Sequence, residues 1–286
     1  MLSGTPCESD MRQAVGEIGL YYELHGDTGN AARPWLVFSH SLACNSAMWR
    51  PQLAEFALDY RVLSFDTRGH GQSDVPAGPY TMEILAEDAH CLLRELGIHK
   101  AHFAGLSMGG MIGQALALRH PDSIASLTIA DSTSRWPAEA ISVFAQRSQM
   151  ALQSGMAPLV DATLARWFTP EFRKTNTDEV ARIGDMILHT PVAGYVGCSE
   201  AIPKIDLTHR LREITCPIMV IVGDRDPGTP VSMSQEIHKN APRSELVVIE
   251  HAAHLSNVEQ PIAFNQALRR FLDRASAATE RKAATN

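Results

Sequence analysis

The sequence predicts an α/β fold with a mainly parallel sheet, flanking helices and an inserted helical cap. Short apolar runs alternate with longer amphipathic stretches, which is typical of strands joined by covering helices. One stretch, residues 132–207, departs from this alternation and has only helical patterns. With 286 residues, the chain is long enough to bury a core without disulfides or a structural metal.

Six apolar runs are expected to form the parallel strands, because each is short and bounded by polar or turn-forming residues. A seventh run, Tyr21–Leu24, is punctuated by glycines and is expected to pair as an antiparallel edge. The six parallel candidates are Trp35–Phe38, Arg61–Phe65, Ala101–Ala104, Leu127–Ala130, Ile218–Val222 and Leu246–Ile249.

Three helices are expected within the alternating part of the chain: Ile84–Leu96, Gly109–His120 and Ile262–Phe271. The insertion contributes three more clear helical patterns. These are Val143–Met156, Leu159–Trp167 and Glu179–Leu188. We therefore expect residues 1–131 and 208–286 to form the core. Residues 132–207 are expected to form a cap over the ligand-binding edge of the sheet.

Composition narrows the possible partners and compartment. Hydrophobic residues make up 45% and charged residues 20%, the net charge is −7, and no dense Lys/Arg run is present. This argues against nucleic acid or an anionic membrane as the main partner. No apolar run approaches the ~20 residues of a membrane span, and the polar stretch 1–12 lacks a signal-peptide core. Five scattered cysteines, including Cys7, indicate reduced thiols and a cytoplasmic protein.

A candidate nucleophile lies in the segment Gly105–Gly109 (GLSMG), between a predicted strand and a predicted helix. A serine in such a G-x-S-x-G turn is held in a strained conformation with its hydroxyl above the sheet. The glycines remove Cβ atoms that would collide in so tight a turn. An isolated motif of this kind arises by chance, but the strand-turn-helix setting favours Ser107 as a nucleophile.

A serine hydroxyl needs a base and a group that orients the base. Two late strands end in loops that supply them in the order Ser, acid, His. The first loop offers Asp224 or Asp226, and the spacing from Gly223 favours Asp226. The second offers His251 or His254, and we favour His254 because it lies deeper in its loop.

The oxyanion of the reaction needs two backbone donors, one from each of two loops. The N–H groups of Leu42 and Met108 are the expected pair, whereas His40 is expected to brace the first loop. No metal or cofactor is expected. The histidines show no His-x-x-x-His spacing, and Gly69–Gly71 is followed by no Lys-Ser/Thr of a phosphate loop.

Four segments carry a family resemblance: 66–73 (DTRGHGQS), 101–113 (AHFAGLSMGGMIG), 166–170 (RWFTP) and 253–261 (AHLSNVEQP). The first two resemble motifs shared across the α/β-hydrolase superfamily. The last two are narrower and resemble the 3-oxoadipate enol-lactonases of bacterial aromatic degradation. The resemblance covers about residues 15–272. The chain departs from the expected S-N-S-L-G at residues 39–44 (SHSLAC), and residues 131–136 (DSTSRW) are also unusual.

The resemblance implies an α/β-hydrolase fold with a helical cap, and catalytic roles for Ser107, Asp226 and His254. It also implies opening of 3-oxoadipate enol-lactone, a small-molecule substrate with an acetate arm. A carboxylate entering an apolar pocket needs a partner, and arginine can hold both of its oxygens. Within the insertion, the candidate substrate-binding residues are Arg135, Trp136, Arg166 and Trp167.

The same candidate residues are compatible with three alternative functions. The chain could be another lactonase or carboxylesterase of this fold, which a substrate panel would reveal. A cofactor-free perhydrolase or haloperoxidase would halogenate a dye with peroxide. A receptor that has kept the pocket without turnover would show no ester hydrolysis.

Overall fold

A computed structural model describes residues 11–285, with side chains described through residue 277. Within these residues, eight strands form one sheet in the order β1-β2-β4-β3-β5-β6-β7-β8. The pairs β1–β2 and β2–β4 are antiparallel, and the other neighbours are parallel. The strands are β1 (Arg12–Val15), β2 (Ile18–His25), β3 (Trp35–Ser39), β4 (Arg61–Phe65), β5 (Ala101–Leu106), β6 (Ile124–Ala130), β7 (Ile218–Gly223) and β8 (Ser244–Ile249).

The six predicted parallel strands are all present, and the chain has the predicted α/β-hydrolase architecture. The antiparallel run at Tyr21–Leu24 lies in β2, but β2 is not the edge. It is covered on one side by β1, whose four residues are too short and too polar to stand out in the sequence.

Helices cover both faces of the sheet, because alternate residues of each strand point to opposite sides. In β3, Val37 packs in one apolar layer with α2 and α3, whereas Leu36 and Phe38 pack in the other with α1 and α11. The helices of this part are α1 (Arg50–Phe56), α2 (Met82–Glu95), α3 (Met108–Arg119), α9 (Val231–Asn240), α10 (Ser256–Glu259) and α11 (Pro261–Thr285).

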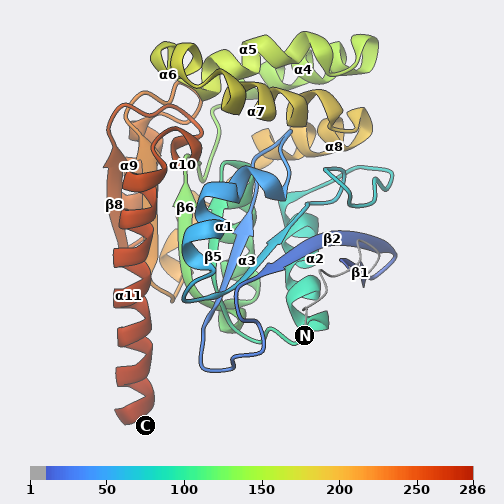
Figure 1. Cartoon of the computed structure of the whole chain (residues 1–286). Helices are drawn as coiled ribbons and strands as arrows, with labels where there is room; N and C mark the ends of the chain where they lie inside the picture. The colour runs from blue at the N-terminus through green and yellow to red at the C-terminus, as the bar shows by residue number, and fades with distance from the viewer. Residues whose placement is uncertain (1–10, 286) are drawn as a thin grey trace, which may run out of the picture.

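The last helix was expected to end at Phe271, but α11 continues to Thr285 (Figure 1). Its extension is rich in alanine and in charged residues that favour helix, and no proline or glycine interrupts it. Within residues 11–285, short 3-10 helices occupy four connections. These are η2 (Ser46–Trp49), η3 (Pro121–Ser123), η4 (Ile202–Lys204) and η5 (Thr208–Glu213).

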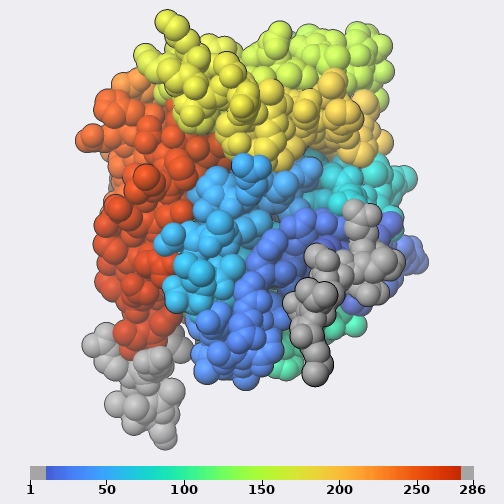
Figure 2. Space-filling model, viewed as in Figure 1, coloured from blue at the N-terminus to red at the C-terminus, as the bar shows by residue number. Residues whose placement is uncertain are grey.

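The insertion consists of helices that gather at the carboxyl ends of the strands (Figure 1). Figure 2 shows these helices covering the upper end of the molecule. The two ends of the insertion meet, because Arg135 and Asp206 form a β-bridge and Leu207 N–H donates to Ser134 C=O at 2.8 Å. The helices are α4 (Ala140–Ser154), α5 (Ala157–Trp167), α6 (Pro170–Thr175), α7 (Thr177–His189) and α8 (Val192–Ala201).

Among the described residues, no helix is both long and apolar enough to cross a membrane.

The backbone of β5 touches that of α3 where the chain turns between them. A Cβ atom on Gly105 would lie 2.1 Å from the carbonyl oxygen of Gly109. Backbone atoms cannot move aside as a flexible side chain can, so this turn requires glycine at position 105.

We predict that Gly105→Ala destabilises the protein by at least about 3 kcal/mol, the upper end of the usual cost of overpacking. The added methyl group can be accommodated only by separating β5 from α3. Urea unfolding of the variant and wild type measures the difference. Gly29→Ala is the matched control, since its nearest neighbour would lie at 3.7 Å, and it should leave the midpoint unchanged. Equal midpoints for the two variants would contradict the argument.

Candidate active site

Ser107 occupies the turn between β5 and α3, with φ 55° and ψ −113°. A positive φ is unfavourable for a residue with a Cβ atom and persists only where the surroundings enforce it. Here Ser107 N–H donates to Ala130 C=O at 2.8 Å, and Ser132 Oγ donates to Ser107 C=O at 2.7 Å. The strained turn expected from the sequence is therefore present, and Ser107 is held from both sides.

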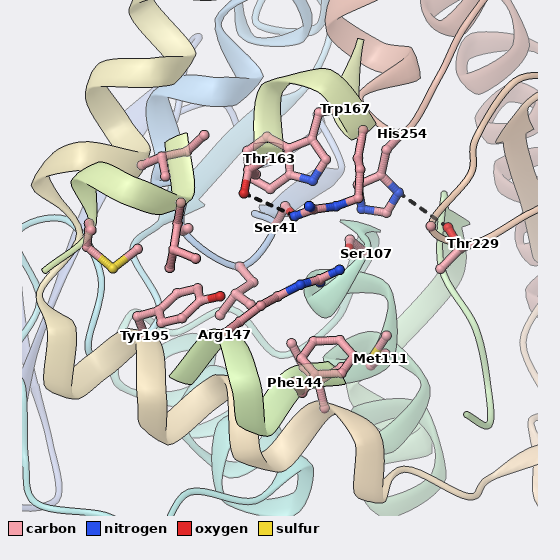
Figure 3. Close-up of a pocket in the computed structure, with 18 of the residues that line it drawn as sticks. Ser41, Ser107, Met111, Phe144, Arg147, Thr163, Trp167, Tyr195, Thr229 and His254 are labelled. Carbon is pink, nitrogen blue, oxygen red and sulfur yellow. Dashed lines mark hydrogen bonds between the residues drawn. The ribbon is translucent and has the colours of Figure 1, made fainter. Parts of the chain in front are cut away.

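Ser107 lines a pocket between the sheet and the inserted helices (Figure 3). The core contributes the loop after β3, the turn at Ser107 and the loops after β7 and β8. The insertion contributes mostly apolar side chains from α4, α5, α7 and α8. Those residues of the insertion are Trp136, Phe144, Arg147, Met156, Leu159, Thr163, Arg166, Trp167, Ile187, Tyr195 and Ile202.

His254 lines the same pocket and is paired with Asp226, with His254 Nδ1 2.7 Å from Asp226 Oδ2. Both side chains are buried. Thr229 Oγ1 donates to the same carboxylate oxygen at 2.6 Å, and the N–H groups of Gly228 and Thr229 donate to the other. A carboxylate acceptor at Nδ1 keeps the proton there, which leaves Nε2 free to accept one.

The pair is also an electrostatic unit. Burial alone would lower the pKa of His254, but the charge and hydrogen bond of Asp226 outweigh burial and raise it above its usual value. Burial would raise the pKa of Asp226, but His254 and Thr229 hold it below its usual value. No hydrogen bond between Ser107 Oγ and His254 occurs among the described residues. Such a contact is often formed only in the substrate complex.

The alternative acid and base lie elsewhere. Asp224 is exposed and accepts a hydrogen bond from Ala252 N–H at 3.2 Å. His251 is also exposed, and its Nδ1 lies 2.8 Å from the guanidinium of Arg225. Neither side chain lines the pocket of Ser107. The geometry thus places His254, paired with Asp226, in the pocket of Ser107, whereas Asp224 and His251 lie on the surface.

The two expected oxyanion donors lie on either side of Ser107 in the fold. Leu42 follows β3 and lines the pocket, and Met108 begins α3 directly after the serine. In the described part of the chain, neither amide N–H donates to another group. The Met108 amide also lies at a helix N-terminus, where negative charge is stabilised.

Three of the four substrate-binding candidates line the pocket: Trp136, Arg166 and Trp167. The expectation for Arg135 is wrong. Its backbone pairs with Asp206 at the base of the insertion, and its half-exposed side chain forms an ion pair with Glu236 at 3.0 Å. This bridge directs Arg135 toward α9 and away from the pocket.

A second pocket arginine, Arg147, was missed in the sequence. Figure 3 shows its side chain extending from α4 toward Ser107. The available signal was its position, because Arg147 lies one turn after Phe144 on the side of α4 that packs inward. This signal is weak, because an arginine at such a position usually lays its stem over apolar surface and keeps its head group in water.

The two pocket arginines carry positive charge without a carboxylate partner among the described residues. Arg166 donates to Thr163 Oγ1 at 3.0 Å, and the Arg147 guanidinium lies 5.6 Å from the centre of the Phe144 ring. Burial, together with repulsion from Arg147, lowers the pKa of Arg166 to about 10. Arg166 therefore remains charged near neutral pH.

Metal ligands do not gather in the described residues: no three His, Cys, Asp or Glu side chains lie close enough together to hold an ion.

These features correspond to a known family. Residues 34–261 match the family described as alpha/beta hydrolase fold, and the chain belongs to that family. It is a hydrolase that resembles the 3-oxoadipate enol-lactonases. It is 38% identical to 3-oxoadipate enol-lactonase 2 of Acinetobacter baylyi, over 86% of this chain and 91% of that protein.

Two further proteins are similar to this chain. The crystal structure of the enol-lactonase from Burkholderia xenovorans LB400 has a TM-score of 0.88 and 37% identity, covering 92% of this chain and 99% of that one. A relative named as a carbamate hydrolase, RutD of Stutzerimonas stutzeri, is 33% identical over 87% of this chain and 95% of its own length.

The paired carboxylate predicts a pH effect. Because only neutral His254 can accept a proton, kcat/KM should rise with pH through a pKa above about 6.5, the usual imidazole value. Asp226→Asn should shift this acid limb to lower pH. It should also reduce kcat/KM on the order of a thousandfold, since the productive tautomer is lost.

Asp224→Asn is the matched control, and should leave both the pH profile and kcat/KM near those of the wild type. His251→Ala and His254→Ala form the corresponding pair for the base. Full activity in Asp226→Asn beside an inactive Asp224→Asn would reverse the assignment.

Proposed function

We propose that this hydrolase opens an acidic enol-lactone, 3-oxoadipate enol-lactone, to give 3-oxoadipate in the β-ketoadipate pathway of aromatic degradation. The observation that carries the proposal is a pair of arginines, Arg147 and Arg166, that line the pocket of Ser107 and His254 without a carboxylate partner among the described residues. Both arginines are half-buried. A partly desolvated cation without an acid favours an anionic ligand, and guanidinium binds carboxylate with two parallel hydrogen bonds. The names of the relatives supply the particular lactone.

Two further pocket groups support an oxygen-rich substrate. Trp136 Nε1 and Ser41 Oγ are buried and have no hydrogen-bond partner among the described residues. An indole N–H can only donate, and a hydroxyl can donate as well as accept. With the two arginines, these groups offer donors to lactone, enol and carboxylate oxygens.

In the proposed reaction, Ser107 Oγ attacks the lactone carbonyl while His254 Nε2 takes its proton. The backbone N–H groups of Leu42 and Met108 stabilise the oxyanion that forms. His254 then returns the proton to the enol oxygen as the ring C–O bond breaks, and the enol becomes a ketone. Water, deprotonated by His254, attacks the acyl carbonyl, and His254 passes that proton to Ser107 Oγ as the bond to the acyl group breaks. Asp226 orients the imidazole and stabilises its cation.

We further propose that residues 132–207 act as a cap that closes this pocket. The bridge between Arg135 and Asp206 joins the two ends of that segment, and the segment supplies Arg147 and Arg166 to the pocket.

We propose a cytoplasmic location because the described cysteines are free thiols. These are Cys44, Cys91, Cys198 and Cys216; Cys7 lies outside the described residues.

The nucleophile assignment predicts that Ser107→Ala loses activity by on the order of a thousandfold or more, because the members of a triad act as a unit. Its circular dichroism should remain native, since the hydroxyl contributes little packing. A fluorophosphonate should label the wild type at Ser107, and EDTA should leave its activity intact. Activity that EDTA removes and zinc restores would contradict this mechanism.

The arginine pair predicts selectivity for acidic substrates. Arg147→Met and Arg166→Met should each lower kcat/KM for the enol-lactone by roughly tenfold or more, about 1.4 kcal/mol. Hydrolysis of a neutral aryl ester should change little. Arg135→Met is the matched control, because its side chain lies outside the pocket.

The substrate panel for this test also contains saturated lactones, simple esters and a carbamate. Equal losses on acidic and neutral substrates would make the arginines structural. If the protein turns over the carbamate faster than the enol-lactone, the proposed substrate is wrong.

A further inference from the structure

The loop after β3 forms one wall of the pocket, through Ser41, Leu42 and Ala43. Its backbone is strained, because Ala43 has a φ of 59°. A residue with a Cβ atom adopts this conformation only when surrounding contacts enforce it. Two buried histidines, His40 and His70, provide such contacts.

His40 connects this loop to the loop after β4. Its Nε2 lies 2.8 Å from the backbone N of Thr67, and its Nδ1 lies 2.8 Å from the carbonyl oxygen of Ser41. An amide N–H can only donate and a carbonyl can only accept. Nε2 is therefore the acceptor and Nδ1 carries the proton, which is the neutral imidazole.

His70 makes the reciprocal connection from the loop after β4. Its Nε2 accepts from Ala43 N–H at 3.0 Å, and its Nδ1 donates to Arg68 C=O at 3.3 Å. The centres of the His40 and His70 rings are 5.2 Å apart, and both residues are fully buried. Each loop thus contributes one histidine that holds the backbone of the other.

The protonation states agree with this geometry. Burial lowers the pKa of His40 to about 4. Burial, with repulsion from His40, lowers the pKa of His70 to about 3. Both rings are neutral near pH 7, so both Nε2 atoms remain available as acceptors.

The two contacts meet at Leu42. Because a peptide group is planar, a bond to Ser41 C=O also fixes the direction of Leu42 N–H, which belongs to the same plane. His40 makes that bond, assisted by Cys44 N–H at 3.1 Å. His70 holds the next peptide group through Ala43 N–H. We propose that His40 and His70 are positioning residues that aim the Leu42 amide at the oxyanion. This inference rests on the proposed function, since the oxyanion belongs to that reaction.

The experiment compares His70→Leu, which removes the acceptor, with His70→Gln, whose side-chain oxygen can still accept from Ala43 N–H. Removal of an oxyanion donor costs about 10²- to 10³-fold in kcat, so a misdirected donor should cost about tenfold or more. We expect His70→Leu to lower kcat by this factor with KM nearly unchanged, and His70→Gln to recover most of it.

A second measurement follows the oxyanion itself. A trifluoromethyl ketone adds to Ser107 as its carbonyl oxygen becomes an oxyanion, and His254 accepts the serine proton. Its affinity should fall in His70→Leu by a factor similar to kcat. His102→Leu is the matched control, because His102 is also a buried imidazole but bonds Ser126 Oγ at 2.8 Å at the start of β5. Its kcat per fluorophosphonate-labelled site should equal that of the wild type.

Unchanged kcat per labelled site in His70→Leu, or equal losses in the Leu and Gln variants, would overturn the positioning role. Absence of turnover in the wild type would instead overturn the proposed function. The ¹⁵N chemical shifts of His40 and His70 test the bridge without turnover. We expect Nδ1-protonated neutral rings at pH 7, and a proton on either Nε2 would overturn the inference.

Discussion

The close backbone contact where β3, β5 and α3 meet is the constraint on which the rest of the site depends. A Cβ on Gly109 would lie 2.2 Å from the carbonyl oxygen of Ser39, just as one on Gly105 would strike Gly109. The serine turn, the start of α3 and the loop after β3 are consequently locked to one another. This contact explains how Ser107 keeps an unfavourable φ, and why the Leu42 and Met108 amides have fixed positions relative to it.

Charge is distributed unevenly across the pocket. On the side of the core, His254 is compensated by Asp226. A further buried carboxylate, Asp131, accepts hydrogen bonds from Gly223 N–H and Ser256 Oγ. Burial and the charge of Asp226 raise the pKa of Asp131 well above its usual value. On the side of the insertion, Arg147 and Arg166 have no carboxylate partner among the described residues, so the acidic groups of the pocket lie on the core side and the arginines on the other.

The two parts of the molecule therefore have different tasks in the proposed mechanism. The core supplies the nucleophile, base, acid and oxyanion donors on short loops at the ends of parallel strands. The helices of the insertion supply the groups that distinguish an acidic lactone from a neutral ester. Relatives named as enol-lactonases and as a carbamate hydrolase match the chain across nearly its whole length. The shared architecture therefore does not by itself fix the substrate.

The sequence by itself determined the strands other than β1, the candidate nucleophile and the order of its expected partners. Those features are local: apolar runs report buried strands, and a glycine-flanked serine between a strand and a helix reports a strained turn. Parallel strands then bring their carboxyl ends to one edge, so Asp226 and His254 could be predicted from loop spacing together with the family resemblance.

Only the tertiary structure decided which arginines face the pocket. Arg135 and Arg166 each precede a tryptophan and look alike in sequence, but a bridge to Asp206 directs Arg135 outward. Arg147 could not be recognised without knowing which face of α4 covers Ser107. The His40–His70 bridge joins residues 30 positions apart through backbone groups, which have the same chemistry at every position in the chain. The direction of a side chain and the pairing of two loops depend on contacts between segments that are far apart in the sequence. No local sequence pattern reports such contacts.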